Sequence, residues 1–353
     1  MRDVAVIQRF LPSRSRGGVG HFTHGLCQAL VRRGNRVTVF SQDPAPAGAS
    51  YTVQLVPLPS SGVRALVAFP FAVARCDFRA FDVIHAQGDN QWIGAAGRPP
   101  LVRTMHGSAL AEAWFNGVRG RSPKRAVMHL FFYAMELVAD LRADTVVLVS
   151  ADTARFYPRT HGVIPNGVDL AALAPDGTPK SPAPSVLFIG EIDSRKRGRL
   201  LLDVFAREVR PAVPDAELWL VSPDRAEGPG VVWCGTVDDA TLAGRLRRAW
   251  VMCLPSAYEG FGRPYIEAMA AGTAVVASWN PGARAALDEG RVGVMADDAA
   301  LGSAIVRLLT DVAARASWEK TGLAHAQRFG WDRVAAEYEA VYDAAIARRG
   351  RHA

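Results

Sequence analysis

Two carboxylates in one short segment late in the chain are the residues best suited to chemistry. Glu259 opens the glycine-rich stretch Glu259–Gly262, and Glu267 follows it after Pro264. The glycines predict a tight, exposed loop, and Pro264 suits the first turn of a helix that would contain Glu267. A carboxylate accepts two hydrogen bonds at once, so either residue could hold a pair of sugar hydroxyls. The alternatives are a surface charge at Glu259 and a dipole-stabilising residue at Glu267.

Three consecutive cations form the second candidate. Arg195, Lys196 and Arg197 follow an apolar run and lead into an expected helix. Positive charge opposes the dipole at a helix N-terminus, so such a cluster is favourable when an anion lies among its members. We therefore expect a phosphate-binding loop, with a solvated basic loop as the alternative.

A glycine-rich turn near the N-terminus is a weaker candidate. The stretch Gly17–Gly20 begins an expected helix, where backbone N–H groups and the helix dipole could bind a phosphate. Thr23 stands where a dinucleotide fingerprint has its third glycine, so we reject that fingerprint. The alternative is a tight turn without a ligand.

His106 ends an apolar run and precedes Gly107. A histidine at the end of a strand could hydrogen-bond a phosphate or a sugar hydroxyl. The alternative is a satisfied, partly buried histidine, and His85 stands in a similar place.

Short apolar runs alternate with helical periodicity from end to end, a pattern typical of parallel α/β units. The strands expected in the first half span Val4–Gln8, Arg36–Phe40, Val53–Val56, Asp82–His85, Leu101–Met105 and Thr145–Val149. Those expected in the second half span Val186–Ile189, Glu217–Val221, Val231–Cys234, Val251–Leu254 and Ala274–Ala277. The expected helices include Gly20–Arg33, Pro123–Leu141, Arg199–Val209 and Pro264–Ala271. After Val294 we expect helices alone, over Ala300–Thr310, Val312–Arg328 and Trp331–Arg348. Doubly wound sheets bind ligands beyond the C-terminal ends of their strands, where every candidate above lies.

A proline-rich stretch separates the two series of strands. Prolines at 165, 175, 179, 182 and 184 resist both helix and sheet, so we expect a linker over residues 166–184. The 353-residue length also suggests two domains.

The composition favours a packed protein with an anionic partner. The chain is 49% hydrophobic and 21% charged, with a net charge of +7. That charge suits nucleic acid, an anionic membrane or a phosphorylated small molecule. No aromatic residues alternate with the cations as a nucleic-acid platform would require, so we expect no nucleic acid.

The cysteines and the apolar runs indicate the compartment. The four cysteines, at 27, 76, 234 and 253, are widely spaced, which disfavours a disulfide framework and a cysteine-rich zinc site. The N-terminus lacks the regions of a signal peptide, and no apolar run approaches the roughly 18 residues that span a bilayer. We expect a cytoplasmic protein.

Several of these motifs together resemble one family. The Glu259–Glu267 segment resembles the E-x7-E motif of the retaining glycosyltransferases of family 4, which have the GT-B fold. The other similar segments are the Gly17–Gly20 loop, the stretch Val163–Asp169 that would open a second domain, and Phe329-Gly330-Trp331 followed by Tyr338 and Tyr342.

The resemblance implies a fold and an activity. The fold would comprise two facing Rossmann-like domains with a cleft between them. Residues 1–165 would bind the acceptor, residues 166–330 would bind the donor, and a helix over 331–348 would pack back on the first domain. The enzyme would transfer a hexose from a UDP- or GDP-sugar to an acceptor hydroxyl with retention of configuration. It would need no metal and no other cofactor, and we find no D-x-D metal motif.

The resemblance also implies roles by position. Glu267 would bind the ribose hydroxyls of the donor. Glu259, with backbone N–H groups of Phe261 and Gly262, would hold the donor sugar and its phosphate.

Other matched positions would complete the site. Arg195 and Lys196 would neutralise the diphosphate, with Arg197 competing for the role of Lys196. His106 would lie beside the transferred sugar, and Gly18 would face the diphosphate from the first domain.

Two departures from the family pattern bear on selectivity. Glu191 stands where the family usually has arginine, and the turn over 279–284 lacks the common glutamate. The sugar selectivity could therefore differ from that of better-known members.

Three other possibilities remain at this point. A nucleotide-sugar epimerase would use the same fold, and a basic module could bind an anionic surface without catalysis. Arg119, Arg121, Lys124 and Arg125 precede an amphipathic stretch over 126–141 that could lie on anionic lipid. The alternative is a core-packed helix with a solvated basic start. The acceptor and the oligomeric state stay open, and the loops Arg9–Arg16 and Ser108–Arg121 would contact the acceptor.

Overall fold

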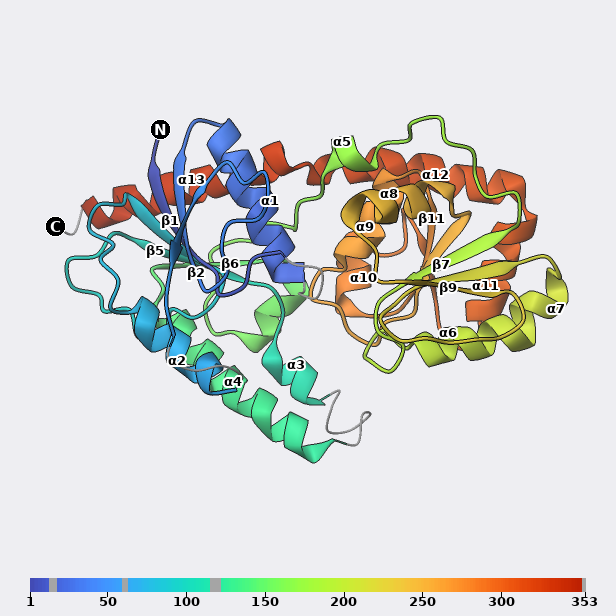
Figure 1. Ribbon diagram of the computed structural model, residues 1–353, viewed down its shortest axis with the longest axis horizontal. Helices are drawn as coiled ribbons and strands as arrows, with labels where there is room; N and C mark the ends of the chain where they lie inside the picture. The colour runs from blue at the N-terminus through green and yellow to red at the C-terminus, as the bar shows by residue number, and fades with distance from the viewer. Residues whose placement is uncertain (13–17, 59–62, 115–121, 351–353) are drawn as a thin grey trace. The chain divides into compact units, whose positions relative to one another are not determined.

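A computed structural model describes residues 1–12, 18–58, 63–114 and 122–350 of the chain (Figure 1). It divides into two compact units. Unit 1 comprises Met1–Gly167 and Trp331–Ala353, and unit 2 comprises Val168–Gly330. Each unit is built on a six-stranded parallel sheet.

The sheet of unit 1 has the strand order β3-β2-β1-β4-β5-β6, which is the order of a Rossmann fold. Its strands are β1 (Asp3–Ile7), β2 (Arg36–Ser41), β3 (Thr52–Leu55), β4 (Val83–Ala86), β5 (Leu101–Met105) and β6 (Thr145–Leu148). In the central strand, Val6 lies opposite Val39 of β2 and His85 of β4. His85 is therefore buried in the middle of the sheet.

Helices cover both faces of this sheet, because side chains alternate between the faces along each strand. Val4 and Val6 face α1 (Gly18–Arg32) and the C-terminal helix α13 (Trp331–Gly350), whereas Ala5 and Ile7 face α2 (Val63–Val73) and α4 (Pro123–Arg142) (Figure 1). The shorter elements are α3 (Ala109–Trp114) and a 3-10 turn over Ala151–Phe156.

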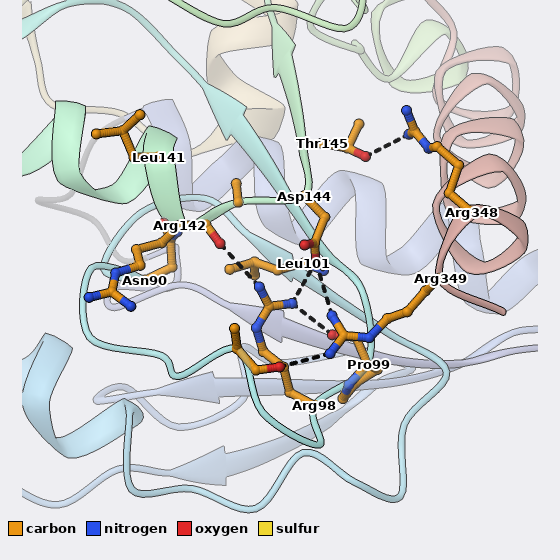
Figure 2. Close-up of polar contacts among 12 residues, drawn as sticks. Asn90, Arg98, Pro99, Leu101, Leu141, Arg142, Asp144, Thr145, Arg348 and Arg349 are labelled. Carbon is orange, nitrogen blue, oxygen red and sulfur yellow. Dashed lines mark hydrogen bonds and ion pairs between the residues drawn. The ribbon is translucent and has the colours of Figure 1, made fainter. Parts of the chain in front are cut away.

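Helix α13 is attached to unit 1 at both of its ends. At its start, the Trp331 ring lies so close to Gly25 and Gly167 that a Cβ atom at either position would collide with it. At its end, Arg348 donates a hydrogen bond to Thr145 Oγ1 (2.8 Å), and Arg349 donates one to the Ala95 carbonyl (2.8 Å). In Figure 2, Arg348 reaches Thr145 and Arg349 reaches Asp144, whose carboxylate also pairs with Arg98 at 2.6 Å. The last helix of the chain is thus part of the first unit.

The sheet of unit 2 has the order β12-β11-β10-β7-β8-β9, which is the same Rossmann order. Its strands are β7 (Ser185–Ile189), β8 (Glu217–Val221), β9 (Val231–Gly235), β10 (Val251–Leu254), β11 (Ala274–Ser278) and β12 (Val294–Ala296). Its helices are α5 (Leu170–Leu173), α6 (Gly198–Val204), α7 (Arg210–Ala212), α8 (Asp239–Arg248), α9 (Arg263–Ala270), α10 (Pro281–Ala286), α11 (Leu301–Thr310) and α12 (Val312–Ala326), with a π turn over Phe205–Val209 and a 3-10 turn over Gln327–Phe329.

Every strand expected from the sequence is present, with bounds that differ by at most one residue. The expectation of helices alone after Val294 was wrong, because Val294–Ala296 forms the edge strand β12 beside β11. Three residues are too short for an alternating pattern to show. The proline-rich linker also contains a short helix, α5, whose N-cap Asp169 accepts a hydrogen bond from Ala172 N (2.9 Å).

Candidate active site

The candidate site of unit 2 lies where two adjacent parallel strands end. Strands β7 and β10 are neighbours in the sheet, so the loops that follow them meet at the same edge. The first loop holds the cations at 195–197 and the second holds Glu259. Ala257 N donates a hydrogen bond to the Arg195 carbonyl (2.8 Å), which ties the two loops together.

Glu259 is a buried carboxylate with two partners. The residue is 6% exposed. Its Oε1 accepts a hydrogen bond from Ser256 Oγ (2.8 Å), and its Oε2 lies 2.7 Å from the Arg195 guanidinium. The alternative of a surface charge at Glu259 was therefore wrong. The same Arg195 group also donates to the Tyr258 carbonyl (2.6 Å), so it holds both the main chain and the side chain of this loop.

Lys196, in the first of these loops, has most of its hydrogen-bonding capacity available. Its Nζ donates one hydrogen bond among the described residues, to the Ile189 carbonyl (2.9 Å). Its stem covers Gly190, where a Cβ atom would collide with it. Burial lowers the pKa of Lys196 and the charge of Arg195 adds to this, while Glu259 and Glu267 act in the opposite direction. The residue as a whole is partly exposed.

Arg197 supports the loops around the site. It adopts a left-handed backbone conformation (φ 55°) at the start of α6. Its guanidinium donates to both oxygens of Asp298 (2.8 and 2.7 Å), to Ser278 Oγ (2.8 Å) and to the Pro255 carbonyl (2.6 Å). Four hydrogen bonds within the protein leave this side chain little capacity for a ligand. Of the two competing cations, Lys196 is the better placed to bind one.

The loop after β10 turns sharply into α9 at Gly262. This glycine has a φ of 81°, which favours glycine, and a Cβ atom there would collide with the Tyr265 ring. The Phe261 ring is buried against Phe329, with ring centroids 5.7 Å apart. The side chain of Phe261 is thus part of the core, and its main chain belongs to the loop.

Glu267 is in the second turn of α9, because the helix begins at Arg263. The expectation that it lies in the first turn was wrong, and so was the alternative of a dipole-stabilising role there. Arg263 Nε donates to its Oε1 at 2.6 Å, and Oε2 has no hydrogen-bond partner among the described residues. The side chain is 12% exposed, so one carboxylate oxygen is available at the rim of the helix.

In unit 1, His106 follows β5 and is partly exposed. Its Nε2 lies 2.7 Å from Gln87 Oε1, and its ring contacts the edge of Phe22 at a centroid distance of 4.7 Å. Burial, and secondarily the charge of Arg103, lowers the pKa of His106 to about 3. The imidazole is therefore neutral at physiological pH. Sequence reasoning missed Gln87 and, in unit 2, Ser256, although both follow strands as the named candidates do.

Gly18 is the first residue of α1, and a Cβ atom there would meet no atom within 4 Å. Packing among the described residues does not require glycine at this position. Gly17 and part of the Arg9–Arg16 loop lie outside the described residues, as do Arg119, Arg121 and half of the Ser108–Arg121 loop.

Helix α4 buries only part of its apolar surface. Tyr133 and Leu137 pack against the core of unit 1. Exposed apolar side chains on its first half are Val127 (66%), Met128 (37%), Leu130 (49%) and Phe131 (48%). Lys124 and Arg125 are exposed at its start. The alternative of a core-packed helix was therefore wrong for this half of α4.

The described part of the chain holds neither a metal-binding cluster nor a membrane-spanning helix. No three or more histidine, cysteine, aspartate or glutamate side chains gather there in a group that could hold a metal ion. No helix among those residues is both long enough and apolar enough to cross a bilayer.

Comparisons with known proteins cover nearly the whole chain. Residues 16–172 match the family model described as Glycosyltransferase Family 4, and residues 183–311 match the one described as Glycosyl transferases group 1. The chain is 30% identical to the phosphatidyl-myo-inositol mannosyltransferase of Mycobacterium leprae, over 93% of each chain. It is 29% identical to the D-inositol 3-phosphate glycosyltransferase of Arthrobacter sp., over 94% of this chain and 90% of that protein.

Solved structures show the same fold. Sucrose-phosphate synthase from Thermosynechococcus elongatus superposes with a TM-score of 0.80 at 23% identity, covering 99% of this chain and 100% of that one. Anabaena Alr3699/HepE in complex with UDP and glucose gives 0.75 at 17% identity, covering 98% and 100%. These likenesses establish two Rossmann-like domains of the GT-B type. With its matched family models and its inositol-directed relatives, the chain belongs to glycosyltransferase family 4 and is a glycosyltransferase.

Proposed function

We propose that the enzyme transfers a hexose from a UDP- or GDP-sugar to a hydroxyl of an inositol phosphate group carried by a lipid, with retention of configuration and without a metal. The observation that carries the donor assignment is the buried Glu259, held by Ser256 and Arg195 next to Lys196. Unit 2 would bind the donor, and unit 1 would bind the acceptor. The acceptor assignment is supported by the relatives, whose names specify phosphatidyl-myo-inositol and D-inositol 3-phosphate.

Each part of the nucleotide sugar would have a matching partner in unit 2. The free Oε2 of Glu267 can accept a hydrogen bond from a ribose hydroxyl. Lys196 Nζ retains two N–H bonds for the diphosphate, and Arg195 lies next to it. Glu259, with the backbone N–H groups of Phe261 and Gly262, would hold the sugar hydroxyls and the adjacent phosphate.

The reaction would take place on one face of the sugar. The bond from C1 to the diphosphate oxygen breaks as the bond from C1 to the acceptor oxygen forms, and the acceptor proton passes to the leaving phosphate. Cations near that phosphate stabilise the charge that develops there. Arg195 and Lys196 would supply this charge in place of a metal, so activity should persist in EDTA.

The donor assignment is tested with a panel of nucleotide sugars, and NMR assigns the anomer of the product. We expect Glu267→Gln to raise KM for the donor at least tenfold, because an amide offers one acceptor oxygen and Arg263 already uses one. The matched control is Glu337→Gln, which removes an exposed i,i+4 ion pair with Arg333 (3.1 Å) and should leave the kinetics unchanged. An inverted product would refute the mechanism, and conversion of the donor without acceptor would indicate an epimerase instead.

A lipid-borne acceptor is supported by α4. Its exposed Leu130 and Phe131, next to Lys124 and Arg125, form a surface suited to an anionic bilayer. The enzyme would lie on the inner face of the cytoplasmic membrane, where cysteines remain reduced, and all four are unpaired here.

Sedimentation with vesicles of phosphatidylglycerol and phosphatidylcholine tests this surface. We expect salt-sensitive binding that is lost in the double variant Leu130→Ser/Phe131→Ser. It should be kept in Val312→Ser, which changes an apolar residue of unit 2 that is even more exposed (64%). Equal activity on soluble inositol phosphate with no vesicle binding would refute the lipid-borne acceptor while keeping the donor assignment.

A further inference from the structure

A chain of hydrogen bonds runs through the sheet of unit 1 from the C-terminal helix to His106. Tyr342 Oη lies 2.7 Å from His85 Nδ1, and His85 Nε2 lies 3.1 Å from Gln87 Nε2. Gln87 Oε1 lies 2.7 Å from His106 Nε2. Tyr342 and His85 are 257 residues apart in the sequence.

The orientation of the Gln87 amide, with its oxygen toward His106 and its nitrogen toward His85, sets the direction of every bond in this chain. Its oxygen only accepts, so His106 Nε2 carries the proton and donates it. Its nitrogen only donates, so His85 Nε2 accepts. A neutral imidazole has one N–H, and His85 Nδ1 therefore donates to Tyr342 Oη.

A second branch of hydrogen bonds reaches the same nitrogen of His85. Thr104 Oγ1 lies 2.8 Å from His85 Nε2 and 2.9 Å from Tyr338 Oη. Because His85 Nε2 is an acceptor, the Thr104 hydroxyl donates to it and in turn accepts from Tyr338. His85, Thr104, Tyr338 and Tyr342 are at most 1% exposed, so solvent does not compete for these bonds.

Protonation of either histidine would break this pattern of hydrogen bonds, and burial of the rings opposes protonation. Burial lowers the pKa of His85 to about 3, and repulsion between the protonated forms of His85 and His106 adds to the effect. The charge of Arg103 acts in the same direction on the pKa of His106, which burial also lowers. Both rings are thus neutral, with one donor and one acceptor nitrogen each.

We propose that Gln87 and His85 are positioning residues that hold His106 as the Nε2–H tautomer, so that Nδ1 accepts a hydrogen bond from a hydroxyl of the transferred sugar. His106 Nδ1 has no hydrogen-bond partner among the described residues. As its single proton is committed to Gln87, the ring cannot donate to a phosphate. This assignment favours a sugar hydroxyl over a phosphate, the two ligands that the sequence left open for His106. It rests on the proposed donor chemistry.

The first test is NMR on the full chain without substrate. Long-range ¹⁵N–¹H correlation distinguishes the two neutral tautomers, and the signals of His106 are assigned by their loss in His106→Asn. We expect the Nε2–H form. A predominant Nδ1–H form or a charged ring at pH 7.5 would overturn the proposal. This readout needs no donor, so it stands whether or not nucleotide sugars are turned over.

The second test removes the amide. Gln87→Met keeps the length and the apolar bulk of the side chain, and we expect a mixture of His106 tautomers and a kcat lowered about tenfold with KM within about twofold. Gln91→Met is the matched control, because Gln91 lies in the same loop at similar burial (8% against 7%). A Gln87→Met enzyme with wild-type tautomer and kcat would overturn the proposal. If this variant does not fold, the wild-type spectrum still decides.

Donor analogues test the direction of the bond to the sugar. At the hydroxyl that meets His106, replacement by hydrogen or by fluorine should lower kcat about equally, since neither can donate. The loss should shrink in Gln87→Met. If every fluorinated donor reacts as well as its parent, Nδ1 does not accept from the sugar. Absence of turnover with every nucleotide sugar would instead refute the proposed function.

Discussion

A single methyl group at Gly282 should displace Glu259, the carboxylate on which the proposed donor site depends. Gly282 lies in α10 and is buried. A Cβ atom there would lie 2.6 Å from both the Cβ and the carbonyl oxygen of Glu259, and 2.8 Å from its carbonyl carbon. Carbon atoms in contact are normally about 3.5–4 Å apart. The main chain at Glu259 must therefore move by about 1 Å.

The magnitude follows from two opposing effects. Alanine is favoured over glycine within a helix by up to about 1 kcal/mol, while overpacking of a dense core costs about 1–3 kcal/mol. We expect Gly282→Ala to lower the free energy of unfolding by about 1–2 kcal/mol. A shift of about 1 Å at a binding group can lower catalytic efficiency up to about 100-fold, so kcat/KM for the donor should fall by at least tenfold.

The control is Gly244→Ala in α8, where a Cβ atom would meet no atom within 4 Å. It should raise the free energy of unfolding by about 0.5–1 kcal/mol and leave kcat/KM unchanged. Urea denaturation and initial rates measure both quantities for both variants. If Gly282→Ala loses stability but keeps wild-type kinetics, Glu259 does not hold the donor. If it behaves like Gly244→Ala in both assays, the close packing itself is refuted.

Three further predictions concern stability. Burial raises the pKa of Asp89 to about 6, so the folded state binds more protons than the unfolded state between about pH 4 and 6, and stability falls as pH rises through this range. Asparagine tolerates the φ of 62° at this position. After a discount for partial exposure, the Asp89→Asn variant should be about 1 kcal/mol more stable than wild type at pH 8 and no more stable at pH 3.5. Urea denaturation at both pH values tests this. For His106, with its pKa of about 3, the unfolded state binds the extra proton, so stability falls as pH drops below about 6.5. Between pH 6.5 and 4.5, the His106→Asn variant should therefore lose about 1 kcal/mol less stability than wild type, as measured by urea titrations. An equal loss in the two proteins would contradict a neutral His106 ring in the folded state. Asp238 caps α8 by accepting from Thr241 N (2.8 Å), so Asp238→Ala should cost about 1 kcal/mol in thermal or urea unfolding, whereas an unchanged midpoint would show that the cap contributes nothing.

The fold could be predicted from local pattern almost completely. Buried parallel strands are continuous apolar runs bounded by polar turns, and such runs were recognisable for all strands except β12. That strand has three residues, and its place at the sheet edge comes from pairing with β11 rather than from its own sequence. The position of Glu267 in α9 was misjudged because the helix begins one residue before Pro264, at Arg263.

The sequence by itself determined which residues can do chemistry and that they follow strands. Spacing around Glu259 and Glu267, and the unfavourable run of cations at 195–197, are properties of neighbouring residues. They persist in any conformation of the chain. For this reason the order of residues alone is enough to indicate the family and the type of reaction.

Tertiary structure alone decided which of those side chains already have their hydrogen bonds within the protein and which keep capacity for a ligand. Arg197 looked equivalent to Lys196 until folding brought Asp298, about 100 positions away, against its guanidinium. His106 is linked through Gln87 and His85 to a tyrosine from the last helix, and these residues meet because β4, β5 and α13 pack together. Hydrogen bonds act over about 3 Å, and only the folded chain brings such distant residues within that range.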